Sequence, residues 1–112
     1  MDKTMISIAK QFSETPAGRY AVDGPFSGQA FRDKILYPAL MESDYVEVEV
    51  DLDGALGYGS SFLEEAFGGL VREKKMSARD LEKRLKIKSS HRLYEDRVWA
   101  YIRDAGKRAT RK

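Results

Sequence analysis

The stretch that decides the fold is Tyr45-Val46-Glu47-Val48-Glu49-Val50-Asp51-Leu52, followed directly by Asp53-Gly54-Ala55-Leu56-Gly57-Tyr58-Gly59-Ser60-Ser61. The first part alternates apolar with acidic residues, and this period of two predicts a strand with one buried face and one acidic face. The second part is rich in glycine and predicts a loop. Residues 62–72 then place apolar side chains at helical spacing, so the unit is strand, loop, helix.

The segments before this unit predict two more strands and a helix. Residues 5–9 alternate apolar and polar side chains and predict a first strand. After a turn at residues 13–18, residues 19–22 are expected to return as a second strand. Ser27 is predicted to cap a helix that ends near Pro38 or soon after, because its apolar residues share one helical face.

The segments after the unit predict the remaining elements. A short helix is expected to start at residues 77–80, residues 85–88 are expected to form a final strand, and residues 92–105 the closing helix. Helices that alternate with strands favour a sheet with covering helices over an all-helical bundle, so the predicted fold class is α/β.

Length and composition limit the organisation of the chain. Its 112 residues fit one domain, and 42% apolar with 34% charged residues suit a soluble globular domain with a core. We expect the domain to span residues 5–105 and a basic, flexible tail to span 106–112. No apolar run approaches the ~20 residues that cross a bilayer, and the N-terminus lacks a secretory signal, so we expect a cytoplasmic protein without membrane association.

Composition and motif spacing argue against most catalytic chemistry. The chain has no cysteine and one histidine, His91, which excludes disulfides, thiolate zinc sites and histidine metal clusters. Read as a phosphate-binding loop, the 53–61 segment fails, because Ser60 stands where the lysine is needed and Phe62 where a third glycine is needed. A serine hydrolase would need a Gly-x-Ser-x-Gly turn, which this loop lacks. We therefore predict no enzyme activity, no cofactor and no metal.

The start of the helix after the loop has two interpretations. Structurally, Ser61 and Glu64 have the spacing of a capping box, and Gly68-Gly69 suggests close approach by another backbone. Functionally, phosphorylation of Ser60 or Ser61 would put a charge near −2 beside an electropositive helix end and would switch a docking surface. Tyr58 and Phe62 are candidate docking anchors, although Phe62 equally fits the core.

Charge is unevenly distributed along the chain, and this supports an alternative function. Residues 1–56 hold five Lys or Arg against ten Asp or Glu, whereas residues 57–112 hold fifteen against eight. Residues 72–92 hold nine basic residues against three acids. With the predicted helices on either side of residues 86–90, this segment can be interpreted as a helix-turn-helix that binds DNA or RNA.

The order of the elements and the 48–70 segment resemble a known family. The match centres on Val48 to Gly54 and on Gly57 to Leu70, and it extends loosely from about Ile6 to Ala105. These residues resemble the STAS domain of anti-sigma factor antagonists and sulfate transporters, and especially its STAS-like relatives of unknown function. The resemblance implies a small mixed central sheet of about four strands covered by helices, in a cytoplasmic bacterial regulator.

The resemblance also implies a mechanism and a site. In the antagonists, a partner kinase phosphorylates a serine at this helix start and the phosphate blocks docking, which implies that role for Ser60 or Ser61 only. The antagonists have an acid before the serine pair and a glycine after it, where this chain has Gly59 and Phe62. We expect a non-enzymatic partner-switching module that docks a histidine-kinase-like ATPase or kinase, and the predicted partner-binding residues are Gly57, Tyr58, Gly59, Ser60, Ser61, Phe62 and Glu65.

Overall fold

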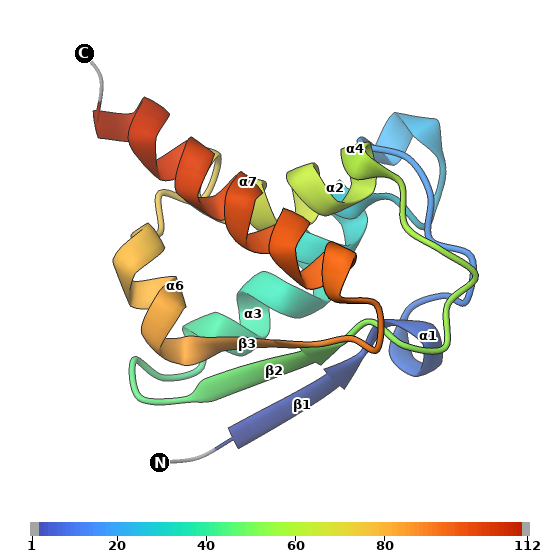
Figure 1. Cartoon of the computed structure of the whole chain (residues 1–112), viewed down its shortest axis with the longest axis horizontal. Coiled ribbons are helices and arrows are strands. Elements are labelled where there is room, and N and C mark those ends of the chain that lie inside the picture. The colour runs from blue at the N-terminus through green and yellow to red at the C-terminus, as the bar shows by residue number, and fades with distance from the viewer. Residues whose placement is uncertain (1–2, 111–112) are drawn as a thin grey trace.

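The central sheet has three parallel strands in the order β1-β2-β3 (Figure 1). The structure is a computed structural model, which describes residues 3–110. The strands are β1 (Lys3–Ser7), β2 (Glu47–Asp51) and β3 (Leu85–Lys88). In the register of the sheet, Val48 of the central strand lies between Thr4 and Leu85.

The alternation predicted for β2 is confirmed. Val46, Val48, Val50 and Leu52 are buried, while the acidic residues between them point to the opposite face and stay partly exposed. On that face Lys3 pairs with Glu49 at 3.3 Å, and lysines of β3 flank the acids on the other side. The period of two thus separates an apolar face that faces the core from a charged face.

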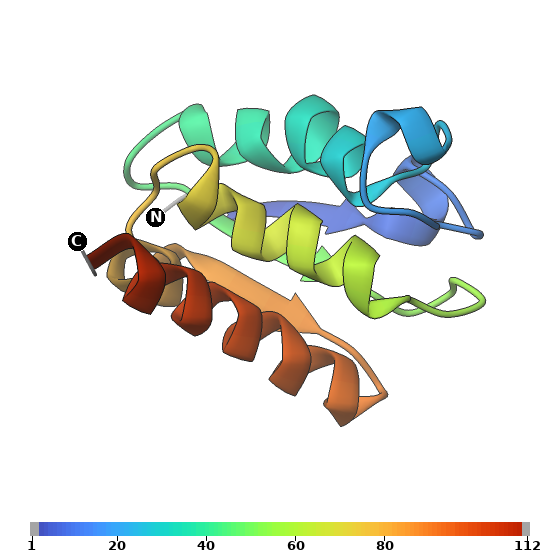
Figure 2. The same cartoon turned by 90° about the horizontal axis from the view of Figure 1, so that it is seen from above.

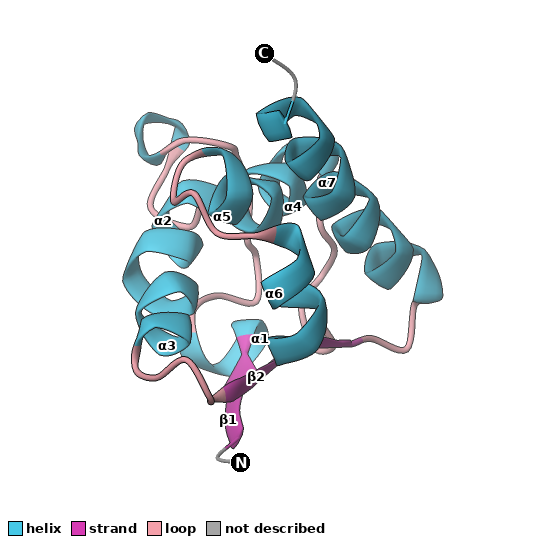
Figure 3. Cartoon of the chain, turned by 90° about the vertical axis from the view of Figure 1, so that its left-hand side faces the viewer, coloured by secondary structure: helices cyan, strands magenta, loops and turns pink. Residues whose placement is uncertain are grey.

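Three helical stretches lie side by side over the apolar face (Figure 2). The first joins α2 (Gly28–Phe31), η2 (Arg32–Leu36) and α3 (Tyr37–Met41) without a break. The middle one joins α4 (Ser60–Leu63), η3 (Glu64–Gly68) and α5 (Gly69–Arg72), and the third is α7 (Arg92–Thr110). Figure 3 shows these helices on one side of the strands, and in the described part of the chain no helix covers the other face. The short elements are α1 (Ile8–Gln11), η1 (Ala21–Asp23) and α6 (Ala78–Arg84).

The first helical stretch begins and ends where the sequence predicted. The Ser27 side chain accepts a hydrogen bond from the Ala30 N–H at 3.1 Å, which satisfies a donor left free at the helix start. Pro38 lies inside the stretch, which ends soon after it, at Met41. The turn before Pro38 is a π-turn, in which the Tyr37 N–H bonds to the Arg32 carbonyl five residues earlier.

The predicted second strand at 19–22 is wrong. This segment contains a 3₁₀ turn, η1, between Gly18 at φ 91° and Gly24 at φ 148°, and Val22 is 91% exposed. Its backbone folds onto the next helix, because the Gly28 N–H bonds to the Gly18 carbonyl at 2.9 Å. The sheet is therefore parallel and three-stranded, and the expected mixed sheet of about four strands is not formed.

The C-terminal half settles the helix-turn-helix interpretation. α6 and β3 form as predicted, and Ser77 caps α6 through the Asp80 N–H. β3 separates α6 from α7 and pairs along its length with β2, whereas a helix-turn-helix needs a short turn between its helices. The helix-turn-helix prediction is wrong for this reason.

The closing helix is longer than the predicted span of residues 92–105. α7 continues to Thr110, through residues 106–110 that the sequence analysis assigned to a flexible tail; the remainder of that tail lies outside the described residues. Among the helices of residues 3–110, none combines the length and the apolar character that a membrane span requires.

Glycine lets the middle helical stretch approach its neighbours closely. A Cβ on Gly28 would lie 2.4 Å from the Phe62 carbonyl oxygen, so only glycine fits where the first and middle stretches cross. Gly68-Gly69 was predicted to allow close approach by another backbone, but the nearest atoms to these two glycines belong mainly to side chains. A Cβ on Gly69 would lie 2.3 Å from Arg32 Nη1, and one on Gly68 would lie 2.7 Å from Glu64 Oε2. These two glycines make room mainly for charged side chains.

Candidate functional site

The loop that follows β2 is held in place on two sides. Gly54 adopts φ 95°, which favours glycine, as the chain leaves the carboxyl end of the strand. The Leu56 N–H donates to the Glu14 carbonyl at 2.9 Å, and Asp53 Oδ1 accepts from the Ser90 N–H at 2.8 Å and from its hydroxyl at 2.9 Å. Both bonds lower the pKa of Asp53 below its ordinary value, and the bond from the Ser90 backbone N–H has the larger effect. The loop is therefore ordered by its neighbours.

Ser60 and Ser61 lie in the first turn of α4, and the predicted capping box is wrong. The N-cap is Gly59, and no side chain caps this helix. The Glu64 carboxylate, predicted to bond to the helix start, accepts hydrogen bonds from Arg19 and Arg72. Both serine side chains are exposed, and neither has a hydrogen-bond partner among residues 3–110. Gly57 is half-buried and Gly59 is exposed beside them.

Tyr58 and Phe62, the predicted docking anchors, belong to the core. The Tyr58 hydroxyl donates to the Leu52 carbonyl at 2.7 Å, and burial raises the pKa of this hydroxyl. Phe62 is fully buried and its ring lies 5.7 Å from that of Tyr58. The exposed apolar side chain of the loop is Leu56, at 87%. In the sequence, the only indication of this exposed side chain is a single leucine inside a segment that is otherwise typical of a loop.

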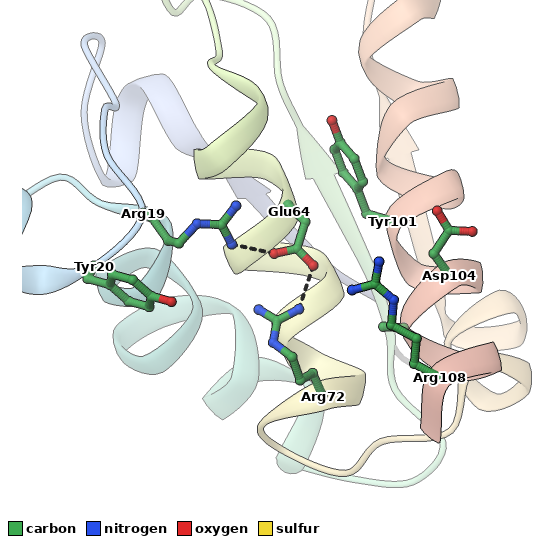
Figure 4. A pocket seen from close by; sticks show the side chains of 8 residues that line it. Arg19, Tyr20, Glu64, Arg72, Tyr101, Asp104 and Arg108 are labelled. Carbon is green, nitrogen blue, oxygen red and sulfur yellow. Dashed lines mark hydrogen bonds and ion pairs between the residues drawn. The ribbon is translucent and has the colours of Figure 1, made fainter. Parts of the chain in front are cut away.

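Glu65, also predicted to bind a partner, is 2% exposed and lies in a buried ion-pair network. Its Oε2 accepts from Arg32 Nη1 at 2.6 Å, and its Oε1 accepts from Arg72 Nη2 at 2.9 Å and from Arg19 Nη1 at 3.2 Å. The neighbouring Glu64 accepts from Arg19 and Arg72 through its two oxygens, each at 2.5 Å (Figure 4). Two carboxylates thus hold three guanidinium groups, which we call the arginine network: Arg19, Arg32, Glu64, Glu65 and Arg72.

Helix geometry places the members of the arginine network. Arg32 begins η2 and Glu64 begins η3, so a π-turn lies on each side of the contact between the first and middle helical stretches. Burial acts to raise the pKa of Glu64, but the hydrogen bonds from Arg72 and Arg19 outweigh it, so the pKa is lowered. Bonds to carboxylates raise the pKa of Arg19, and they raise that of Arg72 against the effect of burial. Glu64, Arg19 and Arg72 are therefore charged at neutral pH.

Among residues 3–110, His91 and the acidic residues do not form a metal site. Within the described part of the chain, no group of three or more acidic, histidine or cysteine side chains has a metal-binding arrangement. The exposed His91 packs its ring edge-on against Tyr94, with centroids 5.8 Å apart.

Comparison with known proteins identifies the family. The family model described as "STAS-like domain of unknown function (DUF4325)" matches residues 27–92. This chain belongs to that STAS-like family. The matched part of the STAS-like domain starts at Ser27, the cap of the first helical stretch, and runs through β2, the loop, the middle stretch and β3. The resemblance inferred from the sequence is confirmed. Searches of curated proteins and of solved structures each found no match.

Proposed function

We propose that this STAS-like domain is a non-enzymatic regulatory module that docks a partner protein through residues 53–61. One observation carries the proposal: the same short segment exposes the Leu56 side chain and two hydroxyls, Ser60 and Ser61, that have no structural partner among the described residues. An exposed apolar side chain on an ordered loop supports docking, since a preformed surface loses little conformational entropy on binding. Tyr58 and Phe62 support the loop from inside, Glu65 belongs to the arginine network, and none of the three takes a direct part in docking.

Phosphorylation of Ser60 or Ser61 is the proposed switch. A phosphate there would lie in the first turn of a helix, where the free backbone N–H groups stabilise negative charge. It would add this charge four or five residues after the apolar Leu56 and so change the docking surface without refolding the domain. The antagonist STAS domains that the chain resembles suggest an ATPase or kinase of the histidine-kinase-like class as the partner.

Site-specific photo-crosslinking tests the docking surface. A photo-reactive residue at position 56 should crosslink one protein partner in extracts of the native host. The control is position 45, because Tyr45 is 78% exposed but lies before β2, at the opposite end of the strand. Equal crosslinking from both positions, or recovery of nucleic acid alone, would contradict the proposal.

Charge substitution tests the switch. Ser60→Asp and Ser61→Asp should lose the partner in affinity capture. Intact-mass measurement of the native protein should find added phosphate, and fragmentation of its peptides should place the phosphate on Ser60 or Ser61. Ser77→Asp is the matched control, since it adds the same charge at the N-cap of α6, a position where aspartate also caps well. If both variants capture the partner as well as the wild-type protein does, the proposed phosphorylation switch is wrong, even if the crosslinking experiment supports the docking surface.

A further inference from the structure

A pocket opens beside the arginine network, away from the loop. Its volume is about 390 Å³, within the range of about 300–1,000 Å³ typical of small-molecule sites. Three segments that are distant in sequence form its wall (Figure 4). The side chains that matter here are Arg19 and Tyr20 before η1, Glu64 and Arg72 of the middle helical stretch, and Tyr101 and Arg108 of α7.

The lining of the pocket carries more positive than negative charge. Arg19, Arg72 and Arg108 face it, against the carboxylates of Glu64 and Asp104. Glu64 is already engaged by Arg19 and Arg72. Arg108 makes no ion pair with any residue in 3–110, although Asp104 lies one turn earlier on the same helix. Figure 4 shows its guanidinium directed toward Arg72 and Glu64.

Several hydrogen-bond donors around the pocket have no acceptor within the described residues. These are the hydroxyls of Tyr20 and Tyr101, the whole guanidinium of Arg108, and the Nε and Nη2 groups of Arg19. Arg19 is nevertheless held in position, because its Nη1 bonds to both carboxylates of the network. A donor fixed by other contacts loses little side-chain entropy when it binds a ligand.

From this arrangement we propose that the pocket binds a small molecule that carries a carboxylate or phosphate group. The anionic group binds the guanidinium of Arg108 through charge-assisted hydrogen bonds, and the free donors of Arg19 and the tyrosine hydroxyls contact the same group or the body of the ligand. Guanidinium suits both anions, because its planar set of donors matches two oxygens at once. The site is separate from the docking loop, and its occupation does not depend on a protein partner.

Titration of the full chain with two simple anions tests the site. Inorganic phosphate and succinate are added separately, at an ionic strength held constant with sodium chloride, while backbone amide signals are followed by NMR. We expect saturable shifts at residues 19–20, 64–72 and 101–108 for at least one anion. The anion that binds with the higher affinity shows whether the site prefers a phosphate or a carboxylate group. Shifts that do not saturate for either anion, or that saturate on other residues, would overturn the proposal.

Two matched variants separate a site from general charge attraction. Arg108→Gln should weaken binding about tenfold, as expected when one charge-assisted hydrogen bond is lost. Arg97→Gln removes the same charge from an exposed position of α7 that does not line the pocket, and it should leave the affinity unchanged. Equal weakening in both variants would show that net charge alone attracts the anion. Thermal melts of both variants should match wild type, because neither side chain bonds to a described residue.

Discussion

Glu65 shows at the scale of one residue how much the fold depends on a buried charge. Acidic side chains are seldom fully buried unless they are paired, and this one accepts hydrogen bonds from three arginines. Arg32 is itself 3% exposed and reaches across from the neighbouring helical stretch. Removing the charge of Glu65 would leave the buried guanidinium of Arg32 with only the partly exposed Asp33, at 2.9 Å, as a counter-ion.

Glu65→Gln should lower the free energy of unfolding by about 3–5 kcal/mol, the range for breaking a buried ion pair. Urea denaturation followed by circular dichroism measures the change. The control is Glu73→Gln, which alters an exposed pair with Arg72 and should cost at most about 1 kcal/mol. If the two variants unfold at the same urea concentration, Glu65 does not have the stabilising role inferred for it.

Glu64 makes stability depend on pH in a definite direction. Its pKa in the folded protein lies below its ordinary value of 4.5, so its ionised form stabilises the fold fully above pH 4.5. This contribution is lost as the pH falls through the lowered pKa. The difference in urea midpoint between wild type and Glu64→Gln should therefore be large at neutral pH and should shrink at about pH 3. A difference that stays constant with pH would contradict this account.

Residue-level prediction succeeded where the interaction is local in sequence. Ser27 and Ser77 were expected at helix starts, and each bonds to a backbone N–H three residues ahead. The arginine network was missed because its ion pairs join residues far apart, such as Arg19 to Glu64, 45 positions away. The same network explains why the capping box failed, since two arginines compete successfully for the Glu64 carboxylate.

At the scale of the element, the contact between the first and middle helical stretches depends on the absence of a side chain at Gly28. Gly28→Ala should destabilise the domain by about 1–3 kcal/mol, because the added methyl group meets the Phe62 carbonyl and the stretches must move apart. Gly57→Ala is the control, since this glycine caps no helix and within 4 Å its added Cβ would meet only the Tyr94 hydroxyl, at an ordinary contact distance of 3.5 Å. Thermal unfolding of the two variants measures the difference. Equal melting temperatures would show that the contact between the first and middle helical stretches accommodates the added methyl group without loss of stability.

Secondary-structure elements were predicted correctly where the local sequence pattern agreed with the pairing of strands that are distant in sequence. β2 and β3, in which apolar and charged residues alternate, were both predicted, and they pair with each other along the length of β3. The segment 19–22 has residues that suit a strand, yet it lies between two glycines with positive φ and forms a turn instead. Sequence alone does not show which strand would have been its partner, so the sheet was predicted with one strand too many.

At the scale of the whole molecule, all three strands share one core, and the central strand has neighbours on both sides. The amide protons of β2 should therefore exchange with solvent most slowly, and those of the edge strand β1 and of residues 53–59 should exchange faster. Hydrogen exchange followed by mass spectrometry measures this order. Equal protection of β1 and β2 would indicate that β1 is covered by something else, such as a second copy of the chain.

The parallel direction of the strands also fixes where the loop after β2 lies relative to the start of β1 and the end of α7. β1 begins and α7 finishes on the left of Figure 1, while the loop after β2 emerges on the right. A solid support or a fused reporter attached near the start of β1 or the end of α7 would lie on the opposite side of the domain from the point where this loop leaves β2. The domain is therefore well suited to surface-based binding measurements, in which the bait can be anchored without masking the proposed contact.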